Sequence, residues 1–211
     1  MAIIETLSAA KVVPVIRTSS RALAETACEW LYEAGLRMFE ITFTVPDAAG
    51  LIKALSTRDD IVVGAGTVLT RDDAAAAIDA GSAFVVSPAT IGDVIALCHE
   101  RGVPALPGAG TATEILTAHT LGAAVVKVFP ASSVGGPAFL KSVKAVYPQI
   151  ALMPTGGIAP AEIETYLEAG AVAVGMGSEM APASALSAGD RQSVVDRARD
   201  LLDRLNGMAS A

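Results

Sequence analysis

The chain has 211 residues, of which 52% are hydrophobic and 18% charged, and its formal net charge at pH 7 is −7. This composition is typical of one domain with a large apolar core and excludes an intrinsically disordered chain. The acidic balance, without a cluster of lysine and arginine, argues against nucleic-acid binding. The negative net charge does not exclude an anionic substrate, because backbone N–H groups can also bind phosphate.

The N-terminal residues MAIIETLSAAKVV lack the basic and apolar segments of a secretory signal. No uncharged apolar run reaches the roughly 20 residues that a membrane span needs. We therefore expect a cytoplasmic protein that does not bind a membrane. Cys28 and Cys98 have no CxxC spacing, so we interpret them as reduced, buried thiols.

Short β-branched runs alternate with helical stretches along the chain. The expected strands cover residues 12–17, 38–43, 61–64, 83–87, 103–106, 124–129, 150–153 and 171–175. Helices are expected at about 20–34, after 46–47, at 71–80, up to about 102, from about 111, and at 137–146, 160–169 and 190–205. Eight such units predict one α/β domain over residues 1–211, a single closed (β/α)8 TIM barrel. A short helix within the first ten residues is expected to cover its bottom.

A barrel of this kind holds its active site at the carboxyl ends of the strands. Side chains alternate between the two faces of a strand, so the charged faces carrying Arg17, Glu40 and Lys127 are expected to point into the interior. Burial is costly for charges that are neither paired nor used in chemistry.

Lys127 lies in the middle of the apolar run AVVKVFP. Burial favours the neutral form of a lysine, and a neutral amine attacks carbonyl carbons. Glu40 can serve as a general acid and base. The residues alone leave two interpretations open: a catalytic lysine, or a structural Lys–Glu salt bridge.

Glycine-bearing turns follow the seventh and eighth strands, at 155–157 and 175–178. Glycines let the backbone approach an anion, and barrels often hold phosphate at this position. Metal chemistry is poorly supported, because His99 and His119 lie on expected outward-facing helices and no ligand spacing occurs.

Taken in order, several motifs resemble the class I 2-keto-3-deoxy-6-phosphogluconate (KDPG) and 4-hydroxy-2-oxoglutarate (KHG) aldolases. The motifs are PVIR, FEITFTVPDA, GAGTV, FVVSP, PGAGTATE, VKVFPA, MPTGGI and VGMGS. The resemblance covers nearly the whole chain. It implies a metal-free homotrimer of barrels, without a cofactor, that cleaves KDPG to pyruvate and glyceraldehyde 3-phosphate. KHG, which yields pyruvate and glyoxylate, is a second expected substrate.

The resemblance also implies roles for individual residues. Lys127 is the Schiff-base lysine and Glu40 the proton shuttle. The residues implied for the pyruvate site are Thr67, Pro88 and Phe129. Those implied for phosphate are Thr155, Gly156, Gly157 and Ser178. Some relatives hold the pyruvate carboxylate with an arginine where this chain has Thr44, so Arg17 is the expected replacement.

Two other functions fit the same pattern. Phosphosugar epimerases and isomerases also use phosphate-binding barrels, with no covalent lysine. A non-catalytic phosphosugar-binding barrel would bind its ligand without turnover. A fold by itself does not separate these functions. The preferred aldehyde, the configuration at C4 and the need for a phosphate stay open at this stage.

Overall fold

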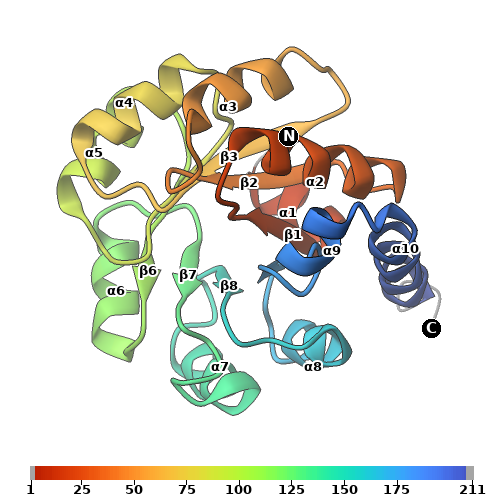
Figure 1. The fold of residues 1–211 in the computed structure, drawn as a ribbon. Coiled ribbons are helices and arrows are strands. Elements are labelled where there is room, and N and C mark those ends of the chain that lie inside the picture. Colours follow the sequence, from red (N-terminus) through yellow and green to blue (C-terminus); the bar gives the residue numbers. More distant parts are fainter. Residues whose placement is uncertain (1–2, 208–211) are drawn as a thin grey trace.

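The computed structural model describes residues 3–207 and shows parallel strands surrounded by helices (Figure 1). The strands are β1 (Val12–Ile16), β2 (Met38–Thr42), β3 (Val62–Gly66), β4 (Val85–Val86), β5 (Ala105–Leu106), β6 (Gly108–Ala109), β7 (Val126–Val128), β8 (Leu152–Pro154) and β9 (Val174–Met176). The first helices are α1 (Ile3–Ala10), α2 (Arg21–Glu33), α3 (Ala48–Ser56), α4 (Arg71–Asp79) and α5 (Gly92–Glu100). The remaining helices are α6 (Ala112–Thr120), α7 (Gly136–Val146), the short 3-10 helix η1 (Pro160–Glu162), α8 (Ile163–Glu168), α9 (Ala183–Ala188) and α10 (Arg191–Gly207).

Several helices begin where a hydroxyl side chain can accept a backbone N–H. Ser20 caps α2, Thr70 caps α4 and Thr111 caps α6, each by accepting the N–H three residues further on. Such a cap contributes about 1 kcal/mol to helix stability. The alternation of strand and helix is therefore determined by local sequence, in the cap residues as well as in the apolar runs.

Within residues 3–207, the strands form two parallel sheets. The larger has six strands in the order β5-β4-β3-β2-β1-β9, and the smaller has three in the order β6-β7-β8. In the larger sheet, Glu40 of β2 lies in register with Val15 of β1 and Gly64 of β3. In the smaller sheet, Lys127 of β7 lies between Gly108 and Met153.

The prediction of one closed eight-stranded barrel is wrong. The expected fifth strand, residues 103–106, is found only as β5 (Ala105–Leu106), and a further short strand that was not expected, β6, follows Pro107, which has no N–H to donate to a ladder. Between β8 and β9 the described residues show only two isolated bridges, Leu152 to Ala171 and Thr155 to Gly175. The α/β arrangement is barrel-like, but it consists of a six-stranded and a three-stranded sheet.

The predicted alternation of side chains is found in two separate apolar clusters. One cluster lies among the strands and contains Val13, Phe84 and Val125. Leu7 of α1 is fully buried in that cluster, so the N-terminal helix covers it as expected. Phe39 belongs to the larger cluster between strands and helices.

Other differences from the sequence expectations are local. Helix α9 was not expected, and β9 begins three residues later than the predicted eighth strand. The predicted domain limits include residues 1–2 and 208–211, which lie outside the described residues. Among the described helices, none is both long and apolar enough to cross a membrane.

The two cysteines lead to a first prediction. Burial raises the pKa of the Cys28 thiol to about 12, with Glu25 and Glu29 adding to the shift, and burial raises that of Cys98 to about 11. Because the thiolate is the reactive form, we expect iodoacetamide at pH 8 to leave both thiols of the native protein unmodified. Intact mass should show two additions only after denaturation. Rapid addition to the native protein would contradict this assignment.

Candidate active site

A buried lysine and a buried glutamate face each other across the two sheets. The Lys127 Nζ lies 3.7 Å from the Glu40 Oε1, and the two side chains are 4% and 0% exposed. Neither Glu40 carboxylate oxygen has a hydrogen-bond partner among the described residues. At 3.7 Å the contact is an ion pair that is longer than a hydrogen bond. Burying a carboxylate without hydrogen bonds costs free energy of folding, so such a group points to a role in chemistry.

The Glu40 carboxylate occupies space that a glycine leaves open. A Cβ placed on Gly66 would lie 2.1 Å from the Glu40 Oε1, closer than any real contact. Gly64 stands two residues earlier on the same strand, and a Cβ there would lie 2.2 Å from the Phe84 ring. The GAG motif therefore clears room for the catalytic candidate and for a core aromatic ring.

Arg17 follows β1 and is oriented by hydroxyl groups. Its guanidinium donates to the Thr67 Oγ1 at 3.1 Å and to the Thr44 Oγ1 at 3.3 Å. Thr42 completes the network, because its hydroxyl lies 2.8 Å from that of Thr44 and donates to the Ile16 carbonyl. Thr44 therefore helps to orient the arginine that was predicted to replace one at its own position.

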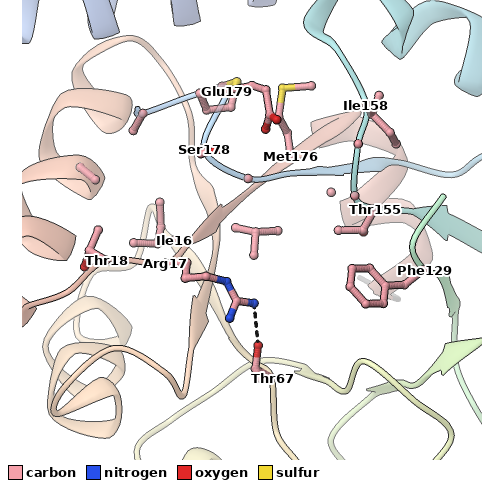
Figure 2. A pocket seen from close by; sticks show the side chains of 18 of the residues that line it. Ile16, Arg17, Thr18, Thr67, Phe129, Thr155, Ile158, Met176, Ser178 and Glu179 are labelled. Carbon is pink, nitrogen blue, oxygen red and sulfur yellow. Dashed lines mark hydrogen bonds between the residues drawn. The ribbon is translucent and has the colours of Figure 1, made fainter. Parts of the chain in front are cut away.

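One cavity of about 480 Å³ joins these elements (Figure 2). Lys127, Arg17 and Thr67 line it together with Pro88 and Phe129. The Lys127 Nζ lies 5.2 Å from the centre of the Phe129 ring. The Lys127 nitrogen therefore has the Phe129 ring as a neighbour and also borders the cavity.

The same cavity extends to the two glycine-bearing turns. Its lining includes Thr155, Gly156, Gly157 and Ser178. Gly156 and Gly157 have φ angles of +95° and +70°, a conformation that glycine adopts without a steric penalty. The Thr155 hydroxyl is buried without a hydrogen-bond partner among the described residues. Backbone groups at such a turn can hold an anion.

The structure thus brings the sequence-predicted residues together. Fully buried Glu40 lies beside Lys127. The other nine predicted residues line the cavity: Arg17, Thr67, Pro88, Lys127, Phe129, Thr155, Gly156, Gly157 and Ser178. Three residues with a place in the site were missed: Gly66, Thr44 and Glu179, which also lines the cavity. For Glu179 the available signal was a charged residue directly after the predicted phosphate turn.

Within the part of the chain that the structure describes, no group of three or more histidine, cysteine and carboxylate side chains could hold a metal ion. A reaction at this site can be derived from Lys127, Glu40 and the polar residues around them.

Comparison with known proteins places these features in a family. Residues 3–197 match the model for "KDPG and KHG aldolase". A 2-dehydro-3-deoxy-phosphogluconate aldolase of Treponema pallidum is 39% identical over 189 residues, covering 89% of this chain and 90% of that protein. A KHG/KDPG aldolase of Escherichia coli is 32% identical over 198 residues, covering 93% of each.

A solved structure of KDPG aldolase from Legionella pneumophila superimposes with a TM-score of 0.86 at 28% identity. It covers 94% of this chain and 97% of that one, and it holds pyruvate captured as a covalent carbinolamine intermediate. The family match, the relatives and the arrangement of the cavity agree. This chain belongs to the KDPG and KHG aldolase family.

Proposed function

We propose that this protein is a class I aldolase, a lyase that reversibly cleaves KDPG to pyruvate and glyceraldehyde 3-phosphate. The observation that carries the proposal is the buried pair of Lys127 and Glu40, 3.7 Å apart beside an open cavity. Family membership supports the same reaction. Cleavage of KHG to pyruvate and glyoxylate is a second proposed activity, supported by relatives named for both substrates.

The reaction begins at Lys127. The Lys127 ammonium first gives a proton to Glu40, and the resulting amine adds to the C2 carbonyl of the keto acid. The carbinolamine takes that proton back on its hydroxyl group and loses water to form a protonated imine. The Legionella relative captured with a pyruvate carbinolamine supports this step. Lys127 lines the cavity, so its nitrogen can meet a keto acid bound there.

Glu40 moves the protons, through a water molecule between it and the substrate. It takes the proton of the C4 hydroxyl, the C3–C4 bond breaks, and the electron pair passes to the imine, which becomes an enamine. The aldehyde leaves, and Glu40 returns a proton to C3. Hydrolysis then releases pyruvate and restores the lysine. General acid–base catalysis of this kind contributes about 10²- to 10⁴-fold to a rate.

The remaining polar residues position the substrate. Arg17, fixed by two threonine hydroxyls, is proposed to bind the pyruvate carboxylate with Thr67. Pro88 and Phe129 are proposed to flank the keto acid. The proposed phosphate ligands are Thr155, Gly156, Gly157 and Ser178.

Family membership favours this function over the epimerase, isomerase and non-catalytic alternatives. A non-catalytic binding barrel would have little reason to bury both Glu40 and Lys127, and an epimerase or isomerase would form no covalent adduct at the lysine. A homotrimer without a cofactor, acting in the cytoplasm, is proposed from the family resemblance.

Covalent trapping tests the role of Lys127. We expect pyruvate with sodium borohydride to add one reduced pyruvyl group, located by peptide mass on Lys127, because an imine is reduced to a stable amine. Lys127→Ala should give no adduct and no turnover, while Lys141→Ala, a change on an exposed helix face, should behave as the wild type. Near-normal aldolase activity in Lys127→Ala would overturn the mechanism.

Removing the acid–base group should separate proton transfer from substrate binding. Glu40→Gln keeps the shape of the side chain but cannot accept a proton. We expect kcat to fall by about 10²- to 10⁴-fold, with little change in KM and with slow adduct formation still detectable by borohydride trapping. A kcat within threefold of the wild type, measured by coupled assay of pyruvate release, would exclude Glu40 as the proton shuttle.

The space beside Glu40 gives a further prediction. In Gly66→Ala the new methyl group must displace the carboxylate, and a shift of about 1 Å in a catalytic group can cost about 100-fold in rate. We expect kcat to fall by at least about tenfold while circular dichroism stays native. Gly92→Ala, where a Cβ meets nothing within 4 Å, is the matched control. Equal activity in both variants would contradict the packing argument.

A further inference from the structure

An acidic side chain lies at the end of the cavity where the substrate phosphate is expected. Glu179 lines the cavity beside Ser178 and Met176, as Figure 2 shows. Its Oε2 lies 3.7 Å from the position that a Cβ on Gly177 would take, which places the carboxylate against the loop after β9. A phosphate bound at this loop would therefore have a carboxylate as a close neighbour.

Within residues 3–207, no lysine, arginine or histidine forms an ion pair with the Glu179 carboxylate. Arg197 of α10 approaches the loop from outside, but its guanidinium donates to the Glu179 backbone carbonyl at 3.3 Å and to the Ser193 hydroxyl at 3.4 Å. The other charged residues that line the cavity, Arg17 and Lys127, belong to the keto-acid end. The cavity is thus cationic where pyruvate is expected and anionic at its far end.

We propose that Glu179 determines which distal groups this aldolase accepts. Its carboxylate weakens the binding of a terminal phosphate and favours an uncharged, hydroxyl-bearing end of a 2-keto-3-deoxy sugar acid. The glycine turns bind an anion through N–H groups, and Glu179 offsets part of that attraction. This inference rests on the proposed aldolase function and concerns its substrate range.

The chemistry of the two groups supports this assignment. A phosphate monoester carries about −1.5 to −2 charges at pH 7 and presents oxygen acceptors to its surroundings. A carboxylate carries the same sign of charge and accepts hydrogen bonds only, so it repels the phosphate and cannot hydrogen-bond to its dianion. A sugar hydroxyl donates, and the half-buried Glu179 carboxylate, which has no side-chain partner within residues 3–207, is a strong acceptor for it. Glu179 thus matches a polyol end better than a phosphate end.

The test compares kcat/KM for KDPG with kcat/KM for unphosphorylated 2-keto-3-deoxygluconate. We expect Glu179→Gln to raise the ratio of the two values by at least about fivefold, the effect of removing one unit of charge a few ångströms from the phosphate. Glu179→Lys should raise it further. Glu168→Gln, a change at an exposed position of α8, should leave the ratio unchanged.

Salt separates a charge effect from a change of shape. The difference between wild type and Glu179→Gln should shrink as ionic strength rises from 0.01 to about 1 M, because the screening length falls from about 30 Å to about 3 Å. A ratio that stays within twofold of the wild type in both Glu179 variants, or that is insensitive to charge reversal, overturns the inference. Borohydride trapping of pyruvate on the same proteins keeps the two proposals distinct. A Lys127 adduct with an unmoved ratio defeats the role of Glu179 alone, and a wild type without an adduct defeats the aldolase function and this inference with it.

Discussion

The site depends on the buried contact between Glu40 and Lys127. Two charged side chains with exposures of 0% and 4% cost several kcal/mol each to remove from water, and their attraction at 3.7 Å returns only part of that. Hydrogen bonds that would complete the compensation are absent from the Glu40 carboxylate within the described residues. The arrangement is therefore poor as a source of stability and well suited to moving protons beside a carbonyl group.

Most of the helices and strands could be predicted from local sequence patterns. β-branched runs that alternate with helical stretches were enough to predict most helices and strands to within a few residues, and the structure shows hydroxyl caps such as Ser20 and Thr111 at the starts of helices. These patterns did not predict how the strands pair, because a ladder depends on backbone groups of distant segments. Pro107 is the informative case. It lies just after the predicted fifth strand and has no N–H to donate to a ladder, and the unexpected strand β6 that follows it belongs to the other sheet.

In the candidate site, too, some residues could be predicted from the sequence and others could not. Residues with a chemical signature, such as Lys127 in an apolar run, could be identified from sequence and lie around one cavity in the structure. Gly66 could not, because its contribution is an absent methyl group, visible only once the Glu40 carboxylate is placed against it. Glu179 was overlooked for a different reason: a charge in a loop is ordinarily interpreted as solvated, and only the cavity shows which group it faces.

The division into two sheets has a consequence for how the catalytic pair is held. Glu40 stands on the six-stranded sheet and Lys127 on the three-stranded sheet, so no single ladder of hydrogen bonds fixes their separation. Besides side-chain packing, the backbone links between the sheets include the two isolated bridges and the hydrogen bond from the Ala124 N–H to the Ala105 carbonyl at 3.0 Å. Slight rotation of one sheet against the other would change the distance between acid and amine without unfolding either. Substitutions in the distant contact between the sheets can thus alter the rate of proton transfer while leaving every cavity residue in place.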